Sequence, residues 1–333
     1  MIARQPRWPL GVLAARDHGE TVGLLGLLAL VVVLFALTTP GFLTEATFRS
    51  IAFQLPELGL LTLAMLIPIL SGGLNLAITF TANMAALVAA WTLQAGGGPE
   101  AGTAVFLVAV VAALAVGAAA GGIMGVIIAY VGAHPILVSL SMMIFLRGLG
   151  EFLTRGGDVS GLPPVVAMIG HGSVLGVPVP LIIFGLCVVA WNVLLRRTRL
   201  GFSIYMLGSN MRAVEFSGVN ARRALTLVYV LSGVMSAIAG MVMLARFNSV
   251  RVGHGESYLL VTVLACFLGR VDPFGGFGRT VSVVLALIIL QVIASGLNAL
   301  GANQHLATAL WGLFLILVMV ARSSWPPSWG RRK

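Results

Sequence analysis

Long apolar runs alternate with short polar breaks along most of the chain. The runs reach bilayer-spanning length, about 17 to 25 residues, and Gly, Pro or Arg stands in the breaks. The pattern predicts an all-α integral membrane protein built as one helical bundle. We expect about ten transmembrane helices, near residues 22–39, 51–70, 76–94, 103–131, 136–153, 180–195, 224–245, 257–270, 281–300 and 305–321.

The eighth of these spans is the weakest. Ser257 to Gly269 is close to the lower length limit for a span, so it either crosses the bilayer fully or forms a re-entrant segment. Charge favours ten spans, because arginines and lysines concentrate on the cytoplasmic side of short loops. A nine-span chain would move the basic C-terminus outward. We therefore expect both termini in the cytoplasm.

Composition supports a membrane location. Hydrophobic residues make up 59% of the chain and charged residues 9%, whereas soluble domains carry roughly 25% charged residues. The net charge of +10 follows from the topology and from attraction to anionic membrane lipid, so no nucleic acid is needed to explain it.

Cys187 and Cys266 both lie in apolar stretches, which indicates neither a disulfide framework nor a metal site.

The sequence divides into a single membrane domain, residues 22–321, between a cytoplasmic tail of residues 1–21 and a basic cytoplasmic tail of residues 322–333. No small-residue cleavage site follows the first apolar run, so we interpret that run as a retained helix. An arginine-dense island, residues 196–223, is expected in the cytoplasm. Residues 154–179 are expected to form a periplasmic loop.

A candidate solute pathway lies between the second and third spans. Pro68, Gly72 and Gly73 lower helix propensity at one depth, and irregular backbone inside a membrane is tolerated where it is buried in protein or lines a wet cavity. Asn75 and Asn83 add uncharged donors and acceptors, which suit a hydroxyl-rich neutral solute. The alternative is that the glycines only permit close helix packing.

Three ionisable residues fall within or near spans, where charge is costly and marks function or pairing. Arg147 and Glu151 are four apart on one helix and are expected to neutralise each other. Glu57 has no local charged partner, so it is a further candidate pathway residue.

The sequence offers no catalytic or metal-binding constellation. Its histidines lack a second ligand at metal-binding spacing, and its ten Asp and Glu residues are scattered. A phosphate-binding P-loop needs a lysine, and the only lysine is Lys333. We therefore expect no enzyme activity and no cofactor in this chain, with ATP and magnesium bound by another polypeptide.

Three stretches resemble motifs of one transporter family. Residues 71–79 read S-G-G-L-N-L-A-I-T and are similar to a Gly-Gly-hydrophobic-Asp-Leu-Ser motif. Residues 208–220 read G-S-N-M-R-A-V-E-F-S-G-V-N and are similar to a Gly-x-Asn-x-x-Ala-Ala-x-x-Ser-Gly-Ile cytoplasmic loop. Residues 268–279 read L-G-R-V-D-P-F-G-G-F-G-R and are similar to a Leu-Gly-Gly-x-x-x-x-Gly-Gly-x-Gly loop. In this order, they resemble ribose-type monosaccharide permeases of ATP-binding-cassette (ABC) importers, within the branched-chain amino acid/ribose permease family.

The resemblance implies a type II ABC importer permease in the bacterial inner membrane. Such a subunit pairs with a second permease chain, as a homodimer or a heterodimer, with a periplasmic solute-binding protein and with a cytoplasmic ATPase. The family's central loop forms a short helix that docks on the ATPase. Carried over to this sequence, that role falls on Gly208, Asn210, Arg212, Ala213, Glu215, Ser217, Gly218 and Val219.

The expected solute is a monosaccharide or a similar small polyol. This chain has Asn75 where the family usually has an aspartate, so a charged contact is absent from that motif. A branched-chain amino acid or a nucleoside is the alternative within the importer class. An ion-coupled secondary transporter and a membrane enzyme or scaffold are the rivals outside it, and Glu57 is the one titratable candidate for ion coupling.

Overall fold

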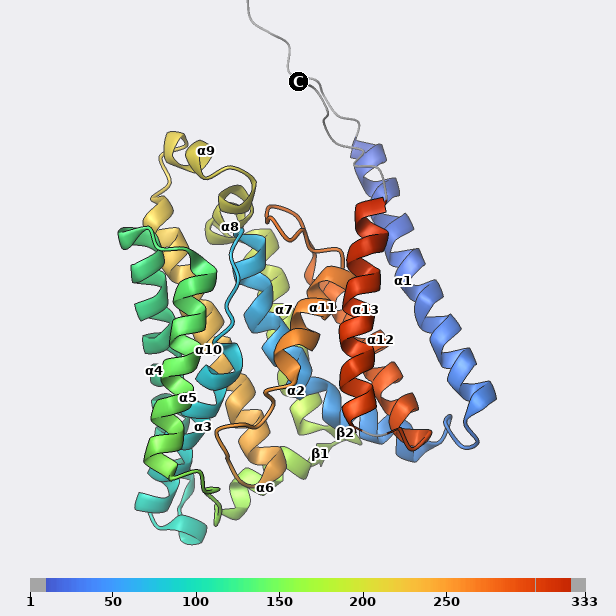
Figure 1. Ribbon diagram of the computed structural model, residues 1–333. Coiled ribbons are helices and arrows are strands. Elements are labelled where there is room, and N and C mark those ends of the chain that lie inside the picture. The colour runs from blue at the N-terminus through green and yellow to red at the C-terminus, as the bar shows by residue number, and fades with distance from the viewer. Residues whose placement is uncertain (1–9, 303, 325–333) are drawn as a thin grey trace, which may run out of the picture.

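The computed structural model describes residues 10–302 and 304–324, which are mostly helical (Figure 1). The first half contains α1 (Leu10–Thr38), α2 (Glu45–Leu70), α3 (Ile78–Ala95), a 3-10 turn (Gly98–Glu100), α4 (Thr103–Val126) with a π-helical turn (Ile127–Val131), α5 (Pro135–Thr154) and α6 (Pro164–His171). The second half contains the hairpin β1 (Ser173–Val174) and β2 (Val177–Pro178), then α7 (Val179–Arg197), α8 (Arg199–Ser209), α9 (Met211–Phe216), α10 (Ala221–Phe247), α11 (Tyr258–Leu268), α12 (Thr280–Ala299) and α13 (Gln304–Ser324).

The predicted spans correspond to these helices. Within the described residues, eight helices are long and apolar enough to cross a membrane. They are α1, α2, α3, α4 with its π-helical turn, α5, α7, α10 and α12. Helix α13 occupies the place of the predicted tenth span. The all-α membrane fold is thus confirmed, and the count of ten is approximate.

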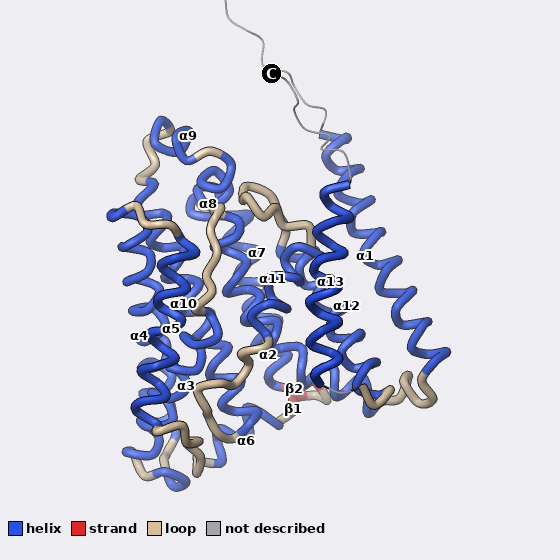
Figure 2. Tube along the Cα trace, in the orientation of Figure 1, coloured by secondary structure: helices blue, strands red, loops and turns tan. Residues whose placement is uncertain are grey.

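Helix α11 accounts for the uncertainty at the eighth span. It has 11 residues, which rise about 16 Å at 1.5 Å per residue, roughly half of the hydrocarbon thickness. An irregular segment, residues 248–257, precedes it and runs from the α6 end of the bundle (Figure 2). The helix alone is therefore too short to span the bilayer.

The two ends of the bundle carry different elements. Helices α8 and α9 lie at one end, together with the start of α1 and the end of α13, while α6 and the hairpin lie at the other (Figure 1). This agrees with termini on the same side as the basic island. Helix α1 begins at Leu10, so the helix includes part of the predicted tail; residues 1–9 and 325–333 of the two tails lie outside the described residues.

The core forms around α2 and α10. Every residue of α2 from Leu55 to Leu70 is buried, and α10 packs against α2, α3 and α4. Glycines bring α4 and α10 together: a Cβ on Gly117 would collide with the Gly233 carbonyl, and one on Gly121 with the Tyr229 carbonyl. Small residues of this kind let helix backbones approach closely in membranes.

Candidate solute pathway and coupling surface

The predicted break after the second span is present, between α2 and α3. Helix α2 ends at Leu70, where the Ser71 hydroxyl donates to the Pro68 carbonyl at 2.8 Å and the Gly73 N–H donates to the same oxygen at 2.9 Å. Gly72 then adopts φ +86°, a left-handed conformation that favours glycine. The chain continues irregularly to Ala77 before α3 begins. The Pro and Gly residues thus produce the expected interruption.

Asn75 fixes this irregular segment to the core. Its side chain is fully buried; Nδ2 donates to the Ser232 hydroxyl at 2.8 Å, and Oδ1 accepts from the Ala77 N–H at 3.0 Å. Ser232, on α10, in turn donates to the Ala64 carbonyl of α2 at 2.7 Å. A chain of hydrogen bonds therefore joins α2, the break and α10.

Gly73 lies against α10 and α5. A Cβ at this position would stand 2.5 Å from the Tyr229 hydroxyl and 3.3 Å from Pro135, so a larger residue would have to displace the Tyr229 side chain. The buried Tyr229 hydroxyl has no hydrogen-bond partner among the described residues, and the same holds for the hydroxyls of Thr79 and Thr81 in the first turn of α3. Buried polar groups are normally paired, so unpaired ones call for an explanation.

The three family-like motifs meet at one junction. The Gly276 N–H, in the loop before α12, donates to the Leu70 carbonyl at 2.8 Å. A Cβ on Gly275 would lie 2.5 Å from the Gly72 nitrogen, and one on Gly208 would collide with Gly276. Sequence reasoning found each motif but missed their contact, because no local pattern reports which distant glycines touch.

A tyrosine reinforces this junction. The Tyr205 hydroxyl, on α8, donates to the Gly278 carbonyl at 2.9 Å. Burial raises the pKa of Tyr205, against the opposing effect of Arg196 and Arg279, so the phenol keeps its proton and remains a donor. The loop before α12 is therefore attached to α8 by both backbone packing and a side chain.

The predicted coupling residues form a short helical turn at the α8 end of the bundle. Asn210 ends α8, its N–H donating to the Met206 carbonyl at 2.9 Å, and α9 follows. The Ser217 hydroxyl donates to the Val214 carbonyl at 2.7 Å, and Gly218 adopts φ +76°, which ends α9 as expected. Val219 is partly buried, and the side chains of Arg212, Ala213 and Glu215 lie outside the described residues.

Glu57 has a partner that sequence reasoning did not find. Its carboxylate is 2% exposed, and its Oε1 lies 2.6 Å from Nε of Arg246 at the end of α10. The N–H does not point at that oxygen, so the contact is an ion pair and not a directed hydrogen bond. The Tyr258 hydroxyl donates to Oε2 at 3.3 Å. Glu57 thus links α2 to the last turn of α10 and to the first residue of α11, which flank the 248–257 segment.

Asn83 holds the middle of the same segment. Its Nδ2 donates to the carbonyl of Val252 at 2.5 Å and to that of His254 at 3.0 Å. The five predicted pathway residues therefore fall into two groups. Asn83 binds the 248–257 segment and Glu57 binds Arg246 and Tyr258 on either side of it, whereas Gly72, Gly73 and Asn75 form the break nearer to α8.

Comparison with known proteins identifies the family. Residues 47–321 match the model of the family described as branched-chain amino acid transport system / permease component. The autoinducer 2 import system permease protein LsrD of Yersinia enterocolitica is 30% identical over 92% of this chain and 93% of that protein. LsrD of Yersinia pseudotuberculosis strain YPIII is 29% identical over 92% of each chain.

No solved structure matches the chain. Permeases of this family work with ATPase and solute-binding partners, and the apolar helices agree with a multi-pass protein of the bacterial inner membrane. The match covers all three motifs that meet at the glycine junction. The chain belongs to the branched-chain amino acid transport system permease family and is a permease subunit of an ABC importer.

Proposed function

We propose that this permease imports a monosaccharide or a similar small polyol, delivered by a periplasmic binding protein. Autoinducer 2, the solute in the names of the LsrD relatives, is the first candidate to test. The observation that carries the proposal is the set of buried hydroxyls at Thr79, Thr81 and Tyr229, which have no partner among the described residues. Hydroxyls can both donate to and accept from a polyol as it passes.

The surroundings of the break support a neutral solute. Asn75 and Ser232 are uncharged, and the carboxylate of Glu57, farther along α2, is already paired with Arg246. A zwitterionic amino acid would need separate positive and negative partners along this route. The pathway around Asn75 therefore suits hydroxyls better than it suits ions.

We further propose that ATP, with magnesium, is bound and hydrolysed by a separate ATPase that docks on α8 and α9. The movement of the ATPase would be transmitted to the island of residues 196–223. The glycine junction would then pass that movement to the α2–α3 break. The pathway would be completed by a second permease chain, identical or different, and residues 22–321 would act as one domain. Alternating access by rocking of packed helices is the general mode for such transporters.

The direct test is ATP-driven uptake by the whole complex in proteoliposomes. The purified permease, its ATPase and its binding protein should accumulate radiolabelled autoinducer 2 or D-ribose when ATP is supplied. Excess unlabelled polyol should compete, while L-leucine and uridine should not. Accumulation of labelled leucine or uridine instead would overturn the polyol assignment and establish one of the alternative solutes.

The same vesicles test the rival mechanism. A secondary transporter would drive uptake from an imposed membrane potential or proton gradient without ATP. We expect no uptake under those conditions and no ATP hydrolysis by the isolated permease. Gradient-driven uptake without the ATPase would refute the proposed energy source.

A further inference from the structure

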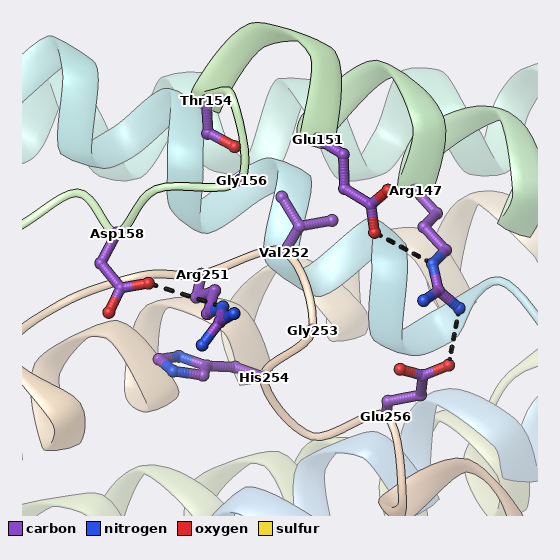
Figure 3. A pocket seen from close by; sticks show the side chains of 10 residues that line it. All are labelled: Arg147, Glu151, Thr154, Gly156, Asp158, Arg251, Val252, Gly253, His254 and Glu256. Carbon is purple, nitrogen blue, oxygen red and sulfur yellow. Dashed lines mark hydrogen bonds and ion pairs between the residues drawn. The ribbon is translucent and has the colours of Figure 1, made fainter.

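An open cavity of about 600 Å³ lies at the α6 end of the bundle, away from the break (Figure 3). Three segments form it: the C-terminal half of α5, the loop that follows, and residues 251–256 before α11. Its volume falls within the range of about 300 to 1,000 Å³ common for small-molecule sites. We call it the outer basin.

The walls of the basin are held in place by backbone contacts. Val159 and Val250 exchange two backbone hydrogen bonds of 2.9 Å, which join the loop after α5 to the 248–257 segment. Asn83 holds the carbonyls of Val252 and His254 from α3. A Cβ on Gly150 of α5 would stand 3.0 Å from Val252, so these elements are in close contact. The walls of the basin are therefore fixed to the helices around them, and the basin is not a gap between loose loops.

The charges in the basin are arranged in pairs, as Figure 3 shows. Arg147 donates to Glu151 at 3.1 Å and to Glu256 at 2.8 Å. Arg251 lies 3.7 Å from Asp158. All of these side chains are about half exposed, so their polar atoms remain accessible from the basin.

This arrangement selects a class of ligand. An anion would be repelled by the carboxylates of Glu151, Asp158 and Glu256. The two arginines that could bind it are already paired with these carboxylates. Among the described residues, no three or more metal-ligating side chains are grouped for a metal ion. A neutral polyol fits better, because its hydroxyls can donate to the carboxylates and accept from the guanidinium groups.

Helix α3, which begins at the break, contacts residues that line the basin. Asn83 of α3 contacts the basin segment, and the Arg147 guanidinium stands over the Phe80 ring, 5.6 Å from its centroid. Thr79 and Thr81, with their unpaired hydroxyls, flank Phe80 in sequence. A solute held in the outer basin would therefore lie beside the first turns of the helix that leads to the break.

We propose that the outer basin is the reception site for the solute on the periplasmic side, where a small neutral polyol binds between Arg147, Glu256 and Asp158. This inference rests on the proposed function for its solute class. It adds a second location, at the α6 end of the bundle and away from the glycine junction by α8, at which the permease itself recognises the solute. The binding protein would then release the solute into a site that competes for it.

The test is solute protection of an introduced thiol in the assembled transporter. A Thr154→Cys variant places a thiol at the basin wall, and a Leu175→Cys variant places one at a 99% exposed position in the hairpin, outside the basin. A membrane-impermeant maleimide reports the accessibility of each, with the unaltered chain as background. Autoinducer 2 or D-ribose should slow labelling of Thr154→Cys and leave Leu175→Cys unchanged; L-leucine should protect neither.

The Glu256→Gln substitution measures the contribution of the basin charges. The concentration of polyol that gives half protection should rise about tenfold, since a hydrogen bond to a charged group is weakened. Glu100→Gln, at an exposed glutamate outside the basin, is the matched control and should leave that concentration unchanged.

The outcomes separate this inference from the proposed function. Absence of protection, in a complex that accumulates the same polyol with ATP, would overturn the reception site and leave the function standing. Protection by the binding protein alone, with no further protection when solute is added, would show a docking surface and would equally overturn it. Failure of polyol uptake itself would refute the proposed function.

Discussion

The Gly276 N–H donates a 2.8 Å hydrogen bond to the carbonyl of Leu70, the last residue of α2. This bond joins the loop before α12 to the end of the helix that precedes the break. Gly208, on α8, packs against the same pair. Movement of α8 thus has a short physical route to the α2–α3 break, through backbone contacts that leave no space for a side chain.

Gly208→Ala should therefore uncouple transport. Its Cβ would collide with the Gly276 nitrogen and the Leu70 carbonyl, and overpacking of this kind costs roughly 1–3 kcal/mol. We expect lower thermal stability of the purified complex and fewer solute molecules imported per ATP hydrolysed. Gly185→Ala, in α7, is the control, because a Cβ there meets nothing within 4 Å. Equal ratios of transport to hydrolysis in the two variants would refute a role for the junction.

Asn75→Leu should weaken uptake without abolishing binding of the ATPase. The change removes the donor to Ser232 and leaves the Ala77 N–H without its acceptor, at a cost of about 1–3 kcal/mol for a buried unsatisfied group. A double-mutant cycle with Ser232→Ala separates this bond from other effects. If Asn75 and Ser232 act together, the two losses of stability should not add. Additive losses, with unchanged uptake, would mean that the two residues only pack.

Gly218→Ala should impair coupling at the ATPase surface. Gly218 adopts φ +76° with open space around it, so the added Cβ strains the backbone by about 1 kcal/mol without a steric clash. Gly176 in the hairpin has φ +81° and equally open surroundings at the opposite end, which makes Gly176→Ala a matched control. Solute-stimulated ATP hydrolysis should fall in Gly218→Ala alone. A similar fall in both would trace the effect to general strain.

Local features of the fold could be predicted from the sequence, because their causes are local. Pro68, Gly72 and Gly73 interrupt the helix where they occur, and Arg147 meets Glu151 because residues four apart share a helix face. Ser217 and Gly218 also act locally: the Ser217 hydroxyl bonds to the Val214 carbonyl and Gly218 adopts a left-handed conformation, which ends α9.

Long-range partners could not be predicted in this way. Glu57 finds Arg246 on α10, and Arg147 finds Glu256 beyond α10, through packing that no periodicity encodes. The short α11 (Tyr258–Leu268) does fall where the eighth span was expected, at residues 257–270. What the sequence leaves open there is whether so short a segment crosses the bilayer, because that depends on the elements packed around it. The outer basin combines residues from such distant segments, so its existence depended on the tertiary structure.

Glu57→Gln should destabilise the permease by leaving Arg246 as a largely buried, unpaired charge. Breaking a buried ion pair on one side costs roughly 3–5 kcal/mol. The double variant Glu57→Gln with Arg246→Gln should recover much of the loss in thermal stability, because no lone charge remains. ATP-driven uptake should persist in the double variant. Complete loss of uptake there, at restored stability, would instead assign the carboxylate a direct role in transport.

His254 should make the stability of the outer basin depend on pH. Burial lowers the pKa of His254 below its ordinary value of 6.5, an effect opposed by Asp158 and supported by Arg251. The folded protein therefore favours the neutral ring, which contacts Phe247 at 4.8 Å between centroids. The stabilisation from the neutral His254 ring is fully present at pH values above the ordinary pKa of histidine. It is lost as the pH falls through the lowered pKa of the folded protein.

The measurement is the unfolding temperature of the purified permease across this pH range, in the unaltered chain and in His254→Gln. The unaltered chain should lose stability as pH falls below about 6.5, because the unfolded state binds the proton more tightly than the folded state does. His254→Gln should flatten this part of the curve. His171→Gln, at an exposed histidine on the same side, should not. A slope that survives in His254→Gln would place the responsible group elsewhere and leave the His254 ring as a packing residue only.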